Sequence, residues 1–255
     1  MKLIIGEYEN GTLSPGYSDL GDDVPSHTLQ ELKGRFSAEY REANLRLTAI
    51  QLLAAATPDQ DLIQAVHSLS GIDTALNTLG KYLGEWHGLH QPLDTATWQE
   101  TLTKTDERPG LATMRTAAQT LLSKREDLLA YINSQAKTIM PNTSTVVGTQ
   151  LAAKLLSEAG SLERLARLPS STVQLLGAER ALFRHLRDRR SKPPKHGVLI
   201  SHELVQTAAQ GRRGKAARVL ANAASIAAKV DYGKGTFIGD ALKKKAEVQL
   251  GLARP

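Results

Sequence analysis

The chain of 255 residues contains no cysteine, so disulfide bonds and thiolate metal sites are excluded, and a reducing compartment fits. Aromatic side chains make up only 4% of the residues, whereas alanine and leucine are abundant, which favours helices. No apolar run approaches the roughly 18 residues that a membrane-spanning helix needs. The start of the chain has too short an apolar run for a signal peptide. These absences predict a mainly helical, cytoplasmic protein without a membrane segment.

Catalytic signatures are also missing. The sequence has no Gly-x-Ser-x-Gly elbow and no cysteine nucleophile. Residues 211–216 resemble a phosphate-binding loop, but they lack its first glycine and the Ser/Thr after Lys215. His87 and His90 lie three positions apart without a third ligand nearby, so packing or surface roles are favoured over zinc. The sequence therefore predicts no metal, no cofactor and no enzyme activity.

The two halves of the chain carry opposite net charges. Residues 1–139 hold 12 Lys/Arg and 18 Asp/Glu, a net charge of −6. Residues 140–255 hold 20 Lys/Arg and 8 Asp/Glu, a net charge of +12. A concentrated basic segment is typical of a protein that binds a polyanion, although a solvated basic surface is the alternative. The second half is therefore predicted to bind nucleic acid.

The first 58 residues predict little regular structure before one helix. Lys2–Ile5 could form a short strand, and Glu9-Asn10-Gly11-Thr12 carries the Asn-Gly signal of a β-hairpin. Gly and Pro residues then indicate a loop, followed by a helix that ends near Thr57-Pro58. We assign residues 1–25 to a short strand or hairpin remnant and residues 26–58 to a linking helix.

Two long apolar patterns of helical period follow. The first has its apolar residues three or four positions apart, at Leu62, Val66, Leu69, Ile72, Leu76, Leu79, Leu83 and Trp86. The second, interrupted by Arg125, has them at Leu111, Met114, Ala118, Leu121, Leu128, Ile132, Ala136 and Ile139. The segments 62–90 and 111–139 are equal in length, and a connection with Pro92 and Pro109 joins them. They predict an antiparallel coiled-coil hairpin over 59–139; two helices of a compact bundle are the alternative.

The apolar seam of this hairpin is too long to be covered by its own partner helix alone. We therefore predict self-association through Leu69, Leu76, Leu83, Trp86, Leu121 and Leu128.

Beyond Pro141 the predicted helices are shorter. Ser161 is a candidate N-cap. One helix is expected to begin at Pro169-Ser170 and to continue through Leu182. Residues 198–200 are expected to be extended, and a last long helix is expected over about 214–230.

Cations gather within this half. Residues 179–229 contain 12 Lys/Arg against three acids. Arg180, Arg184 and Arg187 recur at helical spacing, and arginine binds two phosphate oxygens with its planar fork. The stiff loop around Pro193-Pro194 adds Lys192, Lys195 and His196, whose ring can stack on an unpaired base. The start of the last long helix adds Arg212, Arg213, Lys215 and Arg218, which suit backbone contacts.

Several segments closely resemble the Nop family, in particular its archaeal core protein of box C/D ribonucleoproteins. The matching segments are Leu168-Pro169-Ser170-Ser171-Thr172-Val173-Gln174, Gly177-Ala178-Glu179-Arg180-Ala181-Leu182-Phe183-Arg184-His185-Leu186, Pro193-Pro194-Lys195-His196-Gly197, Arg213-Gly214-Lys215-Ala216-Ala217-Arg218 and Ala227-Ala228-Lys229-Val230-Asp231. In the first half, Asp61–Ala65 and Gly84–His90 resemble the ends of the family's first coiled-coil helix. The resemblance covers about residues 59–250.

This resemblance implies a fold and a function. The fold is mainly α: an antiparallel coiled-coil hairpin, then an all-helical Nop domain over 140–255. A Nop domain docks onto kink-turn RNA that already holds a small kink-turn-binding protein. The coiled coil joins two copies, and an N-terminal domain recruits fibrillarin, which carries out ribose 2′-O-methylation. The chain itself would be a non-catalytic scaffold bound to a box C/D guide RNA.

The resemblance also implies roles for individual residues. Val173-Gln174 and Gly177-Ala178-Glu179-Arg180 match the family's surface for RNA and the kink-turn-binding protein, with Val173, Gly177, Ala178 and Glu179 toward the protein. Residues 181–184 match the segment placed toward the guide–substrate duplex. Lys195 and His196 match the loop at the RNA. Arg180 stands where the family usually has lysine, which keeps the charge.

The N-terminus departs from the family pattern. Only about 25 residues precede the first predicted helix, whereas the family's fibrillarin-binding domain is usually longer than 100 residues. The runner-up function is therefore a Nop-domain module that binds kink-turn RNA without recruiting fibrillarin. A nucleic-acid-modifying enzyme is the alternative from a different class.

Overall fold

The computed structural model describes residues 2–3, 6–9, 12–15, 38–91, 94, 97–103 and 108–252. The chain divides into two units, 1–57 and 58–255. In the first unit, strands β1 (Lys2–Leu3), β2 (Gly6–Glu9) and β3 (Thr12–Pro15) form an antiparallel sheet in that order. Glu9 pairs with Thr12, as a two-residue hairpin turn requires, while Asn10 and Gly11 themselves lie outside the described residues. Helix α2 (Ala38–Ala55) follows, and the predicted start of the linking helix near residue 26 lies outside the described residues.

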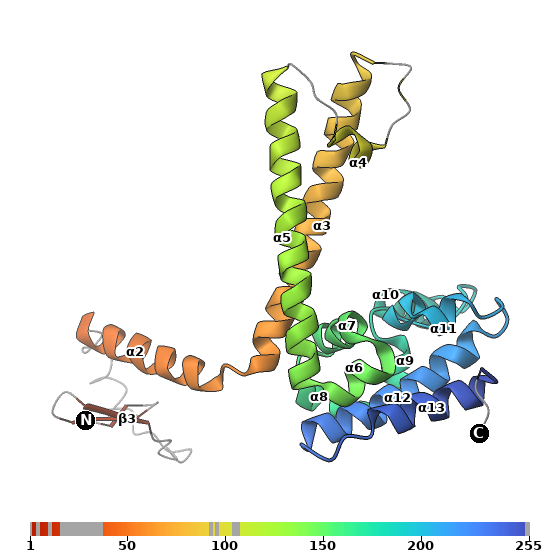
Figure 1. Ribbon diagram of the computed structural model, residues 1–255. Helices are drawn as coiled ribbons and strands as arrows, with labels where there is room; N and C mark the ends of the chain where they lie inside the picture. The colour runs from red at the N-terminus through yellow and green to blue at the C-terminus, as the bar shows by residue number, and fades with distance from the viewer. Residues whose placement is uncertain are drawn as a thin grey trace. The chain divides into compact units, whose positions relative to one another are not determined.

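The second unit begins with the predicted helical hairpin. Helices α3 (Pro58–Gly88) and α5 (Pro109–Ile139) each have 31 residues and run antiparallel (Figure 1). Arg125, which interrupts the apolar seam, forms an ion pair with Asp73 on α3, so the interruption falls at a specific cross-helix contact. The antiparallel hairpin and the mainly helical fold are thus confirmed.

The predicted self-association residues mostly lie against the hairpin itself. Leu76 and Leu83 are buried with Leu111 and Ala118, and Leu121 packs against the same cluster. Leu69 and Leu128 pack against the larger core at the base of the hairpin. Trp86 is 37% exposed, and its ring lies so close to Gly110 that a Cβ there would come within 2.6 Å of it. Leu76 and Leu83 are therefore covered by the hairpin itself and are not available to a second copy. Self-association through the partly exposed Leu69, Trp86, Leu121 and Leu128 stays a prediction.

The connection of the hairpin contains a short helix that the sequence did not indicate, α4 (Trp98–Thr101). Thr97 and Glu100 form a capping box, in which the Thr97 N–H donates to Glu100 Oε2 at 2.7 Å. Trp98 packs on Gly80 of α3, where a Cβ would come within 2.6 Å of the ring. His87 is buried beside this connection and its Nε2 lies 2.8 Å from Asp94 Oδ2, as expected for a packing histidine.

Shorter helices gather at the base of the hairpin, where α5 ends (Figure 1). Their bounds are α6 Pro141–Val147, α7 Thr149–Ala159, α8 Leu162–Arg167, α9 Ser170–Leu175, α10 Glu179–Arg187, α11 Glu203–Gln206, α12 Arg213–Tyr232 and α13 Gly239–Leu250. Ser161 caps α8 as predicted, accepting from the Arg164 N–H at 3.1 Å. Helix α12 packs on α6, α8, α9 and α13, and its many alanines allow these close approaches.

Three local predictions were wrong. The helix expected from Pro169-Ser170 to Leu182 is broken into α9 and α10, because Gly177 adopts a left-handed φ of 78°. Residues expected to be extended form a 3₁₀ helix, η1 (Val198–Ser201). Helix α12 is not the last helix, since α13 follows it and packs against it.

One core joins the hairpin to these helices. Leu62, Ile132, Ala136 and Met140 from the hairpin are buried together with side chains of α6, α7, α8, α9, α12 and α13. Met140 ends α5 and caps α6 at once, so no linker separates the hairpin from the helical domain. The four segments expected from the sequence stay a prediction, but the base of the hairpin shares its core with the domain that follows. No helix in the described part of the chain is both long and apolar enough to span a membrane.

Candidate nucleic-acid interface

The predicted cationic residues come from three structural elements: helix α10, the loop 188–197 and the start of α12. Helix α10 has no buried residue, and Arg180, Arg184 and Arg187 are all exposed on it. Lys192 and Lys195 on the loop and Arg212, Lys215 and Arg218 at the start of α12 are exposed as well. The cations are therefore accessible to a polyanion, and phosphate contacts of this kind dominate affinity for nucleic acid.

Gln174, on α9, connects the loop to the start of α12. Its Nε2 donates to the Lys195 carbonyl at 2.6 Å and, more weakly, to the Gly214 carbonyl at 3.5 Å. Both amide donors are thus used inside the chain, and the RNA contact predicted for Gln174 stays a prediction for its Oε1 acceptor. Gln174 positions the loop and α12 against each other.

The loop is also held through its backbone. The Gly197 N–H donates to the Gln174 carbonyl and the Val198 N–H to the Leu176 carbonyl, both at 2.8 Å. A Cβ on Gly197 would lie only 1.8 Å from the Leu176 oxygen, so no other residue fits this approach without moving the backbone. The cations of the loop therefore project from a fixed base, which lowers the ordering cost of binding.

The other end of the loop is joined to α10. His185 Nδ1 is hydrogen-bonded to the Ser191 carbonyl, and the Arg190 N–H donates to Asp188 Oδ1 at 3.0 Å. His196, predicted to stack on a base, is half-buried on this loop. Part of its surface is thus accessible to a ligand.

Arg213 is less available than its neighbours. It is half-buried, and its Nε and Nη2 donate to the carbonyls of Ala208 and Gln206 at 3.3 and 3.2 Å. These bonds fix the turn between α11 and α12. The predicted RNA contact of Arg213 stays a prediction, and it would involve the guanidinium N–H groups that these two bonds do not use.

The predicted surface for the partner protein centres on the break between α9 and α10. Gly177 and Glu179 are exposed and Ala178 is half-buried, so a partner can reach them. Glu179 Oε1 accepts from the Gly177 N–H at 2.8 Å, which fixes the break. Val173 has no exposed surface and belongs to the core, so its assignment to the partner surface is wrong.

Two exposed apolar side chains lie on α10 among the arginines: Phe183, which falls in the segment 181–184 matched to the guide–substrate side, and Leu186, which was not singled out from the sequence. Phe183 is 66% exposed and Leu186 is 58% exposed. At 100° per residue they lie on the same side of the helix as Arg180 and Arg187. Aromatic side chains beside cations suit unpaired bases as well as phosphates. The signal that could have revealed Leu186 is an apolar pair on a helix whose other outward residues are charged.

A further histidine, His202, lies at the start of α11. His202 Nδ1 accepts from the Leu204 N–H at 3.1 Å and so caps the helix. Burial lowers the pKa of His202, and nearby Lys243 lowers it further, against the opposing effects of Glu203 and a hydrogen bond to the Val146 backbone. The neutral ring is therefore favoured at the cap.

Comparisons with known proteins agree with this geometry. A Nop family model, described as a snoRNA binding domain and fibrillarin, matches residues 91–251. A NOP5 family protein of Methanocaldococcus jannaschii is 33% identical over 234 residues, covering 75% of this chain and 56% of that protein. Nucleolar protein 56 of Caenorhabditis elegans is 28% identical, covering 98% of this chain and 62% of that protein. Nucleolar protein 58 of Schizosaccharomyces pombe is 32% identical, covering 68% and 42%.

The same likeness extends to a solved structure. A chain of the crystal structure of a fibrillarin/Nop5p complex matches with a TM-score of 0.60 and 25% identity, over 99% of this chain and 98% of that chain. The chain spans only about half of the length of the curated relatives that it matches.

Proposed function

The chain belongs to the Nop family, and from this premise we propose that it is a scaffold subunit of a box C/D guide-RNA ribonucleoprotein. It docks onto kink-turn RNA together with a kink-turn-binding protein and supports ribose 2′-O-methylation by fibrillarin. It contributes no catalytic site and no cofactor of its own, and we place the particle in the cytoplasm. The observation that carries the proposal is the pair of hydrogen bonds from Gln174 Nε2 to the Lys195 and Gly214 carbonyls. They join the loop 188–197 to the start of α12, and the exposed arginines of α10 add further cations.

The test of this function is a gel-shift titration on kink-turn RNA with and without the kink-turn-binding protein. Alone, the chain should bind RNA weakly and with a strong dependence on salt, because phosphate contacts dominate. With the partner bound, affinity should rise well above that baseline, since Gly177, Ala178 and Glu179 give the surface a part suited to protein. Equal binding in the two titrations would contradict the proposal.

Fibrillarin recruitment is the point on which the leading function and the runner-up differ. The structure of a fibrillarin/Nop5p complex contains a chain of similar extent to this one, which favours the leading function. Size-exclusion chromatography of the chain mixed with fibrillarin separates the two. Co-elution supports the methylation scaffold, and separate elution supports a kink-turn-binding module that does not recruit fibrillarin.

Self-association through the hairpin is part of the proposal, but its surface must exclude the buried Leu76 and Leu83. The outer face of α5 has a shallow groove lined by small side chains: Ala112, Thr113, Thr116, Ala117, Thr120 and Leu121. Thr113, Thr116 and Thr120 donate their hydroxyls to carbonyls one turn earlier, which leaves their methyl groups outward. A second hairpin could approach closely along this face.

Replacing His196 with alanine should weaken assembly on kink-turn RNA about tenfold, because base stacking on an aromatic ring is worth roughly 1–3 kcal/mol. The melting temperature should stay unchanged, since the half-buried ring forms no hydrogen bond with the described part of the chain. The measurement is a gel shift on the preassembled RNA, with His196→Phe as the conservative variant that restores part of the affinity. A lower melting temperature without rescue by phenylalanine would instead make His196 a structural residue.

A further inference from the structure

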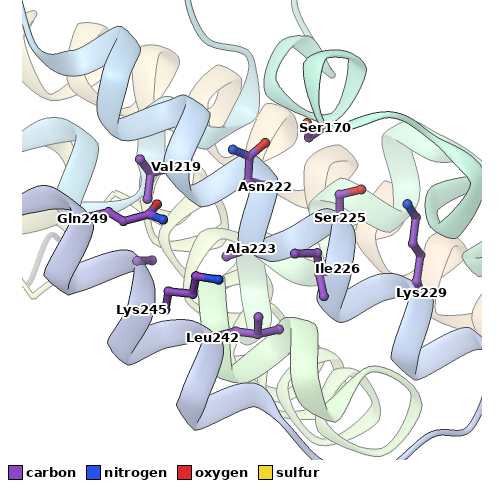
Figure 2. Close-up of a pocket in the computed structure, with 11 residues that line it drawn as sticks. Ser170, Val219, Asn222, Ala223, Ser225, Ile226, Lys229, Leu242, Lys245 and Gln249 are labelled. Atoms are coloured by element: carbon purple, nitrogen blue, oxygen red, sulfur yellow. The ribbon is translucent and has the colours of Figure 1, made fainter. Parts of the chain in front are cut away.

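An open groove lies between helices α12 and α13, and none of the residues predicted to contact RNA lines it. Its volume is about 350 Å³, and it is lined from α12 by Asn222 and Lys229 and from α13 by Lys245 and Gln249, among others (Figure 2). Figure 2 shows these four side chains along the two helices that border the groove. We propose that this groove binds a segment of single-stranded RNA through its sugar–phosphate backbone, as a second RNA contact of the Nop domain.

Four polar side chains of the groove have no partner among the residues that the structure describes. Asn222, Lys229, Lys245 and Gln249 are exposed, and none forms a hydrogen bond or an ion pair with any residue in the described ranges. Ser225, which is buried at the groove, is by contrast already bonded to the Leu168 carbonyl at 3.2 Å. Two ammonium groups and two amides thus offer donors to a ligand without first breaking an internal contact.

The charge of the groove selects an anionic ligand. No Asp or Glu is among the residues that line it, whereas Lys229 and Lys245 come from opposite walls. Lysine acts on phosphate as a point charge on a flexible stem and therefore tolerates many backbone geometries. The amides of Asn222 and Gln249 supply both donors and acceptors for base or ribose edges.

The shape of the groove favours a single strand over a duplex. Its α12 wall runs from Val219 to Lys229, about 15 Å at 1.5 Å per residue. Its floor contains Ala223, Leu242 and Ala246, and Ile226 is 45% exposed. Packed helices typically have axes about 8–10 Å apart, so a trough between two of them suits one extended strand, with apolar surface against ribose and base faces and cations on both sides.

The groove is distinct from the surface that carries the proposed kink-turn contact. That surface uses α10, the loop 188–197 and α12 as far as Arg218, whereas the groove begins at Val219 and continues along α12 and α13. The inference rests on the proposed function only in taking the bound polyanion to be RNA. An RNA held at the first surface could therefore continue along α12 into the groove as an unpaired strand.

The experiment measures fluorescence anisotropy of the full chain with a labelled uridine octamer and, separately, with kink-turn RNA preloaded with its binding protein. The variant Lys229→Gln/Lys245→Gln should lose about fivefold or more in affinity for the octamer. Its slope of log affinity against log salt should fall by about 1.4, as expected when two single-strand phosphate contacts are lost. Its binding to the preloaded kink-turn RNA should stay close to that of the parent.

Two matched variants separate this site from general electrostatics. Lys137→Gln/Lys154→Gln removes the same charge from exposed positions on α5 and α7 and should leave octamer binding unchanged. Arg180→Gln/Arg184→Gln should weaken kink-turn binding more than octamer binding. If the parent failed to bind the preloaded kink-turn RNA, the proposed function would fail while the octamer measurements still decided the groove.

Three outcomes would overturn the groove assignment. The first is octamer binding by Lys229→Gln/Lys245→Gln that equals the parent's. The second is an equal loss in Lys137→Gln/Lys154→Gln, which would indicate only the net charge. The third is displacement of the octamer by a glutamate octapeptide at equal concentration, which would make an acidic protein segment the occupant of the groove.

Discussion

Replacing Gly197 with alanine should displace the loop that carries Lys192, Lys195 and His196. The new Cβ would lie 1.8 Å from the Leu176 oxygen, a backbone atom that cannot rotate away. The hydrogen bonds from the Gly197 and Val198 N–H groups to α9 would be lost with the displacement. We expect the free energy of unfolding to fall by about 3 kcal/mol and the affinity for preloaded kink-turn RNA to fall at least about tenfold.

The matched control for this substitution is Gly211→Ala. Gly211 is exposed in the turn before α12, and a Cβ there would meet no atom within 4 Å. Chemical denaturation and gel shifts of both variants give the two free energies. Gly197→Ala with the stability and affinity of the parent would show that the loop does not depend on this close approach.

Replacing Asp231 with alanine should destabilise the whole helical domain. Asp231 is buried near the end of α12, where its Oδ1 accepts from the Asn142 backbone N–H and Nδ2 at 3.0 and 2.8 Å. Its Oδ2 accepts from the Thr143 N–H and Oγ1 at 2.8 and 2.7 Å. Removing the carboxylate leaves buried donors unpaired, so we expect a loss of about 4 kcal/mol in the free energy of unfolding.

The position of Asp231 is unfavourable within its own helix, and its contacts with α6 explain why it is stabilising nevertheless. A carboxylate in the last turn of a helix is disfavoured by the partial negative charge of the helix end. Here it lies at the start of α6 and supplies the cap that this helix otherwise lacks. The control is Asp240→Asn at the exposed first turn of α13, which should change stability little. Equal melting temperatures for Asp231→Ala and Asp240→Asn would contradict the capping role.

The hairpin was predictable from the sequence because its pattern repeats over many turns. Apolar residues three or four positions apart fix both the helical period and the buried face, and Pro109 marks the start of the second helix. The same pattern does not determine whether that face packs on the other helix of the hairpin or on a second copy of the chain. Leu76 and Leu83 are buried by the chain's own second helix and not by another copy, which is a fact of tertiary packing.

The candidate surface was predictable in its charges but less in its internal contacts. Exposed cations such as Arg180 and Lys195 follow from composition and spacing, because charged side chains rarely lie in a core. The role of Gln174 could not be derived, since its partners are carbonyls 21 and 40 positions away along the chain. Val173 was misassigned for the same reason: adjacency to a surface residue in sequence says nothing about burial.

Local conformation was hardest to predict where tertiary contacts override propensity. Residues 198–200 have the β-branched composition of a strand, yet they form a 3₁₀ turn, and the Val198 N–H bonds back to the Leu176 carbonyl. The break at Gly177 depends on a left-handed φ that a window of helix-forming residues conceals.

The direct junction at Met140 has a mechanical consequence. A helix of 31 residues is about 46 Å long, so the tip of the hairpin lies far from the shorter helices at its base. Because Met140 is fully buried and is the single residue between α5 and α6, the junction has no linker that could bend freely. The hairpin therefore acts as a lever: a force applied at its tip is transmitted to the core beneath α12 and, under the proposed function, changes the angle at which the domain meets the RNA.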